Sequence, residues 1–176
     1  MTIQSRITAI CFICIALSAP VMADCLDKNA NTNMLPSTPT SRFTLQSDIV
    51  VQRPTRLSWM RCAIGQTWDG DSCTGSPDLL NWQDALARAA IEELGGHSDW
   101  RLPDRNELQS IVETRCWSPA INVTVFPATP TQPFWSSTAR VSPTPGQVWQ
   151  VDFDNGAVAP ADHDLTAAVR LVRGDN

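Results

Sequence analysis

The ten residues Asp99-Trp100-Arg101-Leu102-Pro103-Asp104-Arg105-Asn106-Glu107-Leu108 combine a turn with the start signals of a helix. Pro103 precedes a position where Asp104 can accept a hydrogen bond from the first turn of a helix. Glu107 stands three residues further on, which completes a capping box, and Leu108 then begins an apolar stripe. We therefore predict a helix that starts at Asp104.

Trp100, Arg101 and Leu102 form the approach to that helix. Trp100 and Leu102 are expected in the core, and Arg101 is expected to pair with a carboxylate and hold the turn. A guanidinium group suits that role because it binds a carboxylate through two parallel hydrogen bonds. The functional alternative makes Arg101 an anion-binding group and Glu107 an acid–base group. We favour the structural role for both.

A second helix is predicted upstream, over Leu79 to Leu94. Its apolar residues recur at helical spacing, and Gly95-Gly96 ends it. The residues on that face are Trp82, Ala85, Leu86, Ala89, Ala90 and Leu94. Trp82 is accordingly a structural residue, and the turn that follows the helix accounts for His97.

The rest of the chain is predicted to form short strands. Asp154-Asn155-Gly156 is a strong hairpin-turn signal. The expected strands are Arg42 to Val51, Leu57 to Cys62, Phe134 to Ser137, Val148 to Phe153 and Ala167 to Val172. Arg170 on the last of these strands and Arg173 directly after it are expected to pair with carboxylates, as Arg101 is. This order of elements predicts an α+β fold.

Composition narrows the classes of function. The chain has 176 residues and a formal charge of −5, which suits a single domain. Basic residues never cluster beyond pairs, which argues against a nucleic-acid partner. Only two histidines are present, and none of the common catalytic or metal-binding motifs occurs. We therefore expect a protein that is not an enzyme and that needs no metal or other cofactor.

The first 23 residues read as a cleaved signal peptide. Arg6 precedes an apolar run from Ile7 to Leu17, and the segment ends with small residues up to Ala23. The run is shorter than the roughly 20 residues that a membrane-spanning helix needs. We expect no membrane span and an exported protein that is periplasmic, secreted or held at the cell surface. Residues 24–41 would then form an extended leader, and residues 42–176 the domain.

Four cysteines remain after cleavage, which implies disulfides in an exported chain. Three pairings are possible. We favour Cys62–Cys73, because the segment between them suits a tight loop, together with Cys25–Cys116, which would tie the leader to the domain. Loops of these lengths would stabilise the fold by about 3 and 4.6 kcal/mol on the chain-entropy view.

Two tryptophans and two acidic turns are the candidates for ligand binding. Trp135 and Trp149 can stack on sugar rings if they are exposed, or can belong to the core. The polar candidates are Asp152, Asp154, Asn155, Asp162, His163 and Asp164. Crowded carboxylates can bind calcium, but no EF-hand pattern is present, so we expect solvated turns and no metal.

Two loop regions would carry that surface, Thr129 to Gln147 and Asp154 to Leu165. The first contains four prolines and is predicted to lack a regular element, which is typical of a preformed binding loop or of a cover over the sheet. The acidic residues nearby make polyanions poor ligands and favour neutral glycans or basic protein surfaces. A test would replace Ser142 to Gly146.

Six segments, in this order, resemble the bacterial DUF1566 domain, also called the Lcl C-terminal domain. They are Leu57 to Cys62, Gly65 to Trp68, Trp82 to Ala85, Asp99 to Pro103 with Glu107-Leu108, Phe134 to Ser137 and Val169 to Gly174. One departure is visible, since the family commonly has Thr-Gly-Leu where this chain has Thr55-Arg56-Leu57. If that glycine needs a positive φ, the turn is altered here.

The resemblance implies a C-type-lectin-like fold, distantly similar to formylglycine-generating enzymes. It also implies an exported adhesion or recognition module that binds an extracellular glycan or protein. The alternatives are a structural subunit of a pilus or envelope complex and a catalyst of the formylglycine-generating kind. That catalyst relies on two reactive cysteines late in the chain, and no cysteine follows Cys116.

Overall fold

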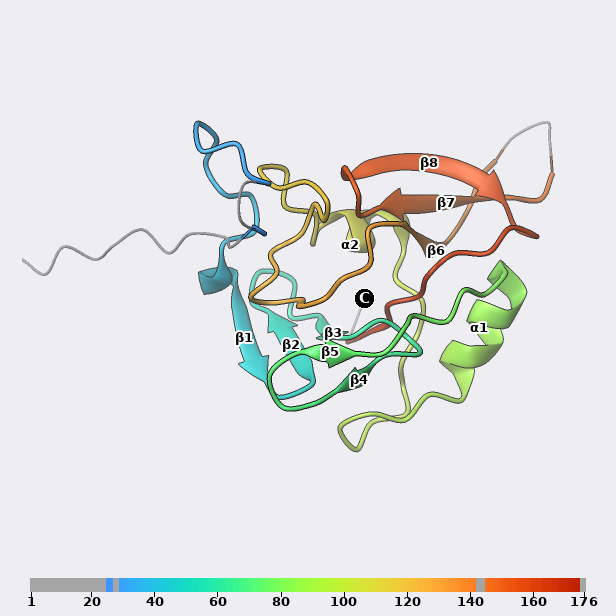
Figure 1. The fold of residues 1–176 in the computed structure, drawn as a ribbon. Coiled ribbons are helices and arrows are strands. Elements are labelled where there is room, and N and C mark those ends of the chain that lie inside the picture. Colours follow the sequence, from blue (N-terminus) through green and yellow to red (C-terminus); the bar gives the residue numbers. More distant parts are fainter. Residues whose placement is uncertain (1–24, 27–28, 142–144, 175–176) are drawn as a thin grey trace, which may run out of the picture.

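Two helices and three small antiparallel sheets make up the described part of the chain, which is residues 25–26, 29–141 and 145–174 of a computed structural model (Figure 1). The fold is α+β, as predicted. The predicted signal peptide lies outside the described residues. In chain order, the elements are a 3₁₀ turn (Thr40–Arg42), β1 (Phe43–Gln46), β2 (Ile49–Gln52), β3 (Ser58–Met60), β4 (Thr67–Trp68), β5 (Cys73–Thr74), α1 (Trp82–Ala90), α2 (Arg105–Gln109), β6 (Pro133–Ala139), β7 (Gln147–Asp152), β8 (Ala157–Asp162) and β9 (Val172–Arg173).

The first sheet has the strand order β1-β2-β3-β9. The single strand predicted over Arg42 to Val51 is wrong, because the chain reverses there and forms the β1–β2 hairpin. Ser47, at the reversal, has a φ of 54°, a left-handed conformation that no apolar alternation reveals. The strand predicted around Trp59 is present as β3, and Trp59 is fully buried.

The three-stranded sheet has the order β6-β7-β8, and both of its pairings are antiparallel. The hairpin turn predicted at Asp154-Asn155-Gly156 joins β7 to β8, and Gly156 has the positive φ (79°) that such turns need. β8 itself was not expected, because Pro160 and alternating alanines give it little strand signal.

The C-terminal segment 167–173 runs between the four-stranded and the three-stranded sheets and joins them. Ala167 exchanges backbone hydrogen bonds with Leu80, Ala168 bonds to the β6 backbone, and Val172 pairs with Arg101. The predicted strand over Ala167 to Val172 is therefore only partly correct, since β9 is confined to Val172–Arg173. The segment changes partner almost at every residue, so no single ladder forms, although residues 167–172 are all buried.

Both predicted helices are present. α2 has the predicted capping box, because Asp104 accepts from the Glu107 backbone and Glu107 accepts from the Asp104 backbone. α1 is capped by Asn81 and ends at Ala90, four residues before the predicted end at Leu94. The chain leaves the helix early because Leu94 pairs with His97 across a turn in which both glycines have positive φ.

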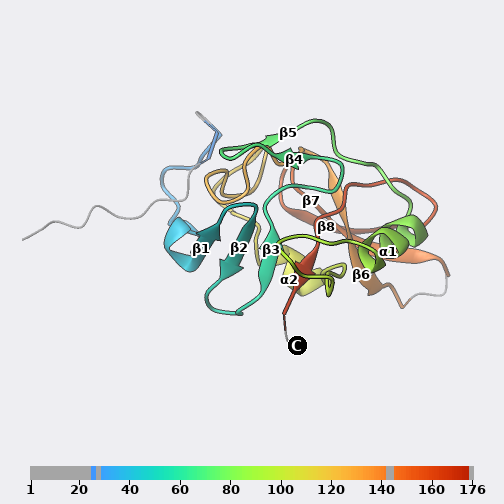
Figure 2. The ribbon, with the colours of Figure 1, turned by 90° about the horizontal axis from the view of Figure 1, so that it is seen from below.

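Both predicted disulfides are present, Cys25–Cys116 and Cys62–Cys73. The first ties the leader to the domain, where Ala30 also pairs with Cys116. The second closes the segment that carries β4 and β5, which Figure 2 shows at the rim of the molecule. Within the described ranges, no helix has the length and apolar character needed to cross a bilayer.

Candidate functional site

Trp135 lies in the core and not on the ligand-binding surface considered for it from the sequence. Its side chain is fully buried, and its indole N–H donates to the Leu80 carbonyl at 2.7 Å. Trp135 belongs to β6, which lies between β7 and the C-terminal segment, and the Trp135 backbone N–H donates to the Ala168 carbonyl. No ligand can stack on this ring, so we remove Trp135 from the candidate surface.

Of the two candidate tryptophans, Trp135 and Trp149, only Trp149 is partly exposed to solvent. It is half-buried on β7, and the Arg105 guanidinium lies 5.0 Å from its ring centroid. A contact of this length is within range of a cation–π interaction. One part of the ring is therefore already covered by the N-terminal residue of α2.

The two acidic turns do not form one site. Asp152 pairs with Ala157 at one end of the β7–β8 ladder, and Gln147 pairs with Asp162 at the other end. At about 3.3 Å per residue, six paired residues separate the two ends by roughly 17 Å. The surface predicted over Asp154 to Leu165 is therefore split by a strand.

At the first turn, the side chains complete the turn itself. Asp152 accepts from the Asp154 backbone at 2.9 Å, and Asn155 accepts from the Ala157 backbone at 2.9 Å. Asp154 in turn accepts the Ser118 hydroxyl at 2.5 Å. Local hydrogen bonds thus explain why these polar residues are here.

At the second turn, Asp162, His163 and Asp164 bring three ligand-capable atoms within 4.8 Å of one another. Asp162 accepts from the Asp164 backbone, and His163 Nδ1 lies 3.0 Å from an Asp164 oxygen. The His163 backbone also bonds to Gly146 and to Trp82, which holds the turn against the start of α1. These bonds account for the arrangement.

The irregular loop predicted over Thr129 to Gln147 is also wrong in extent. β6 occupies Pro133–Ala139 at its centre, which confirms the strand predicted over Phe134 to Ser137 and makes the connection to β7 much shorter than expected. Proline can occupy this strand because Pro133 is its first residue. The segment proposed for replacement, Ser142 to Gly146, includes residues 142–144, which lie outside the described residues.

Arg101 and Glu107 form the expected pair, with two N–H···O contacts of 2.8 Å. Burial raises the pKa of Glu107, but hydrogen bonds from Arg101 and from the Asp104 backbone outweigh it and hold that pKa below its usual range. Both groups use their bonding capacity on each other and on the turn. Trp100 is buried beside them and donates to the Leu94 carbonyl.

Arg170 has a different partner from the one predicted. The side chain is fully buried, and among the described residues it donates to the Met60 and Arg61 carbonyls and to the Thr129 hydroxyl, with no carboxylate. The rings of Phe126 and Phe134 also lie against it. Burial lowers the pKa of Arg170 to about 9, so the group is charged at neutral pH. Arg173, by contrast, pairs with Asp99 at 2.7 Å, as expected.

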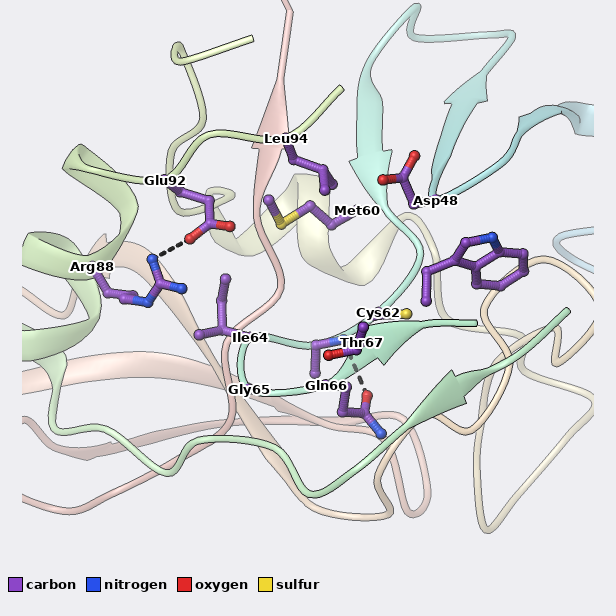
Figure 3. A pocket seen from close by; sticks show the side chains of 12 residues that line it. Asp48, Met60, Cys62, Ile64, Gly65, Gln66, Thr67, Arg88, Glu92 and Leu94 are labelled. Carbon is purple, nitrogen blue, oxygen red and sulfur yellow. Dashed lines mark hydrogen bonds and ion pairs between the residues drawn. The ribbon is translucent and has the colours of Figure 1, made fainter. Parts of the chain in front are cut away.

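A pocket of about 240 Å³ opens between the Cys62–Cys73 segment and the end of α1 (Figure 3). Its apolar floor consists of Met60 and Ile64, which are nearly fully buried, together with Leu94. Figure 3 shows the Arg88–Glu92 ion pair on one side of this pocket and Asp48 on the other. Neither the sequence motifs nor the predicted surface pointed to this place.

The two carboxylates at the pocket, those of Glu92 and Asp48, differ in whether they are paired. Glu92, just beyond the end of α1, is neutralised by Arg88 four residues earlier on the helix. Asp48 is half-buried, and its carboxylate accepts no hydrogen bond and forms no ion pair with any residue that the structure describes. The pocket therefore carries one net negative charge, located at Asp48.

Trp68 on β4 forms part of the wall. Arg61 lies over its ring at 4.1 Å, and the same guanidinium donates to the Ser47, Thr124 and Val125 carbonyls. Burial lowers the pKa of Arg61, which agrees with a cation held inside the protein. The contact with Arg61 thus holds the ring of Trp68 in place.

Trp68 separates two hollows. It lines the pocket of Figure 3, and it lines a shallower hollow of about 460 Å³ that Arg61 and Asp71 also border. Arg61 does not line the pocket, so the part of Trp68 that faces the pocket is not covered by that contact. A half-buried tryptophan on a disulfide-closed loop is a rigid contact for a ligand.

Sequence reasoning missed this site because its parts are far apart in the chain. Asp48 belongs to the β1–β2 turn, Trp68 to the disulfide loop and Leu94 to the turn after α1. The one available signal was the Trp68-Asp69-Gly70-Asp71 run between two paired cysteines. Loops held by a rigid scaffold often carry binding residues.

Residues 48–173 match the family model described as the Lcl C-terminal domain. The match starts at Asp48, so β1 and the leader lie outside it even though β1 completes the first sheet. No curated protein matches the chain.

Proposed function

The chain belongs to the Lcl C-terminal domain family, and we propose that it is an exported recognition module that binds an extracellular ligand without catalysing a reaction. The pocket beside Trp68 is the proposed binding site. This choice replaces the surface that the sequence suggested, which is divided between the two ends of β8 and has lost Trp135 to the core.

The observation that carries the proposal is that charged groups elsewhere in the molecule are bonded within the protein, whereas some groups at the pocket are not. At the Arg101–Glu107 pair and at Arg170, nearly every charge is bonded within the protein. At the pocket, the Asp48 carboxylate and one side of Trp68 have no such partner among the described residues. Groups left unbonded by the fold are available to bind something else.

Rigid support is a second argument for binding. The disulfide Cys62–Cys73 closes the loop that carries Trp68, and Arg61 holds the ring in place. A preformed surface loses little conformational entropy when a ligand binds, which favours affinity. We also propose a C-type-lectin-like scaffold, on the resemblance and on the α+β arrangement of the elements.

Export is part of the proposal. The paired cysteines support it, because disulfides persist mainly in oxidising compartments outside the cytoplasm. The signal-like sequence up to Ala23 supports it as well. Periplasmic, secreted and surface-held forms all agree with these observations.

The pocket lining argues against catalysis at this site. Its titratable side chains are Asp48, Arg88 and Glu92, and its cysteine, Cys62, is held in a disulfide. The lining contains no histidine and no free thiol, and its one hydroxyl group, on Thr67, forms no hydrogen bond with a described base. Nucleophilic catalysis uses a hydroxyl or thiol that is activated by such a contact.

The test is to block the pocket. Thr67 is exposed on β4 and lines the pocket, so Thr67→Trp should fill it without disturbing the core. The full exported chain would be applied to an array of glycans and to an array of secreted and cell-surface proteins. We expect a ligand for the unaltered protein and loss of its signal with Thr67→Trp.

Thr74→Trp is the matched control. Thr74 is the cross-strand partner of Thr67, is also exposed and does not line the pocket. It should keep the signal. If Thr67→Trp binds as well as the control, the pocket is not the binding site; if neither array yields a ligand, the recognition function itself is contradicted.

A further inference from the structure

We propose that the pocket beside Trp68 receives the side chain of an arginine presented by a protein partner. The inference rests on the proposed function and names the chemistry of the ligand at that same site. Three properties of the pocket carry it: its volume, its charge and the order of its apolar and polar surfaces.

The volume suits one side chain. Sites for drug-sized ligands usually enclose about 300–1,000 Å³. The pocket holds about 240 Å³, which is below that range. A whole oligosaccharide or a large cofactor does not fit, whereas one long side chain projecting from a partner surface does.

The charge selects a cation. Asp48 supplies a carboxylate that no described residue neutralises, while Glu92 is balanced by Arg88. An anionic group entering the pocket would meet a net negative charge and would find Arg88 already bonded. A guanidinium group would instead gain the Asp48 carboxylate, to which it can donate two parallel hydrogen bonds.

The surfaces lie in the order that an arginine requires. Met60, Ile64 and Leu94 form an apolar floor along which methylene groups can pack. Asp48 and Trp68 then provide a carboxylate and an aromatic ring for the charged end. Arginine suits this pair better than lysine does, because its planar group both stacks on rings and binds carboxylates bidentately.

The molecule as a whole favours the same class of partner. The chain carries a formal charge of −5, so a basic protein surface would be attracted over a distance before contact. One anchoring side chain in a pocket, surrounded by weaker contacts, is a common arrangement at protein interfaces.

The experiment uses defined peptides. The probe is a capped Gly-Gly-Arg-Gly-Gly peptide, and its partner carries citrulline, which keeps the shape of arginine but has no charge. Binding is followed by nuclear magnetic resonance, through the backbone signals of Asp48 and the indole signal of Trp68. We expect saturable shifts at both residues with the arginine peptide, and binding weaker by about fivefold or more with citrulline.

Two variants separate the pocket from general attraction. Asp48→Asn removes the charge with little change of shape and should weaken the arginine peptide by about fivefold. Asp71→Asn is the matched control, because Asp71 is exposed on the same disulfide loop but borders only the neighbouring hollow. It should bind like the unaltered protein.

The outcomes distinguish this inference from the proposed function. Equal binding of the citrulline and arginine peptides, or unchanged binding by Asp48→Asn, overturns the arginine assignment. So does a set of shifts confined to the turn at Asp162 to Asp164. If the array ligand is lost with Thr67→Trp while the arginine peptide does not bind, the pocket recognises another group, and only the inference fails.

Discussion

Glu113 and Asp48 are both carboxylates beside a disulfide-stapled segment, yet they are used in opposite ways. Glu113 is fully buried, and its two oxygens accept from the Ser37, Thr38 and Arg115 backbones and from the Ser37 and Thr38 hydroxyls. Asp48 is half-buried, and its carboxylate accepts no hydrogen bond from the residues described. The first carboxylate binds the leader to the domain, and the second faces a pocket.

The contrast provides a criterion for separating structure from function in this chain. A charge that the fold has surrounded with donors contributes to stability and has nothing left for a ligand. A charge left open contributes little to stability, because water solvates it in both the folded and the unfolded states. Variants at the two carboxylates should therefore affect different measurements.

The largest effect is expected from Glu113→Ala. It removes the acceptor for the N–H and O–H groups of buried Thr38 and of half-buried Ser37, and each unsatisfied buried group costs about 1–3 kcal/mol. We expect the free energy of unfolding in urea to fall by about 3 kcal/mol or more. Glu113→Gln keeps one carbonyl oxygen and should fall between Glu113→Ala and the unaltered chain. A loss below about 0.5 kcal/mol would show that the leader does not depend on this contact.

Acid should weaken the same contact. Burial raises the pKa of Glu113, but hydrogen bonds from Ser37, Thr38 and Arg115 outweigh it, so the pKa lies below its ordinary value of 4.5. The folded carboxyl binds fewer protons than the unfolded one, so its contribution is fully present above 4.5 and is lost as the pH falls through the folded pKa. Urea unfolding at pH about 7 and about 3.5 should therefore show a smaller acid loss in Glu113→Ala than in the unaltered protein. Equal acid losses would contradict the assignment.

The carboxylates of the fold differ in how far the sequence predicted their contacts. The capping box at Asp104 and Glu107 was predictable because three residues of separation place both groups at one helix end. The leader was expected to be tied by Cys25–Cys116, but Glu113 was missed. Its donors in the leader, Ser37 and Thr38, are more than 70 residues away, and spacing along the chain does not reveal such contacts.

The pocket was missed for the same reason. It forms only when the β1–β2 turn, the disulfide loop and the end of α1 meet. Tertiary contacts also decided the roles of Trp135 and Arg170. The sequence did not reveal that Trp135 would be fully buried or that Arg170 would be bonded to carbonyl groups. Local patterns predicted the elements, whereas the choice of partners depended on tertiary packing.

A smaller effect of opposite sign is expected at the turn before β3. Arg56 has a φ of 60°, a left-handed conformation that favours glycine, and it is the position where the family commonly has glycine. Arg56→Gly should raise the free energy of unfolding by about 0.5–1 kcal/mol. Thermal unfolding would measure it, and no gain would mean that the side chain of Arg56 compensates for its backbone. Because Arg56 does not line the pocket, a stabilised Arg56→Gly chain also lets binding losses be separated from stability losses.

The smallest effect on stability is expected from Asp48→Asn. Its carboxylate has no partner to lose among the described residues, and substitutions of this kind usually change the free energy of unfolding by less than about 0.5 kcal/mol. The change is best measured by urea unfolding of the Arg56→Gly chain with and without it, beside Glu113→Ala in the same background. A loss comparable to that of Glu113→Ala would mean that Asp48 belongs to the fold after all, and the comparison between the two carboxylates would no longer mark a binding site. A near-zero change, together with weaker binding of the arginine peptide, would show that this carboxylate contributes to binding and hardly to stability.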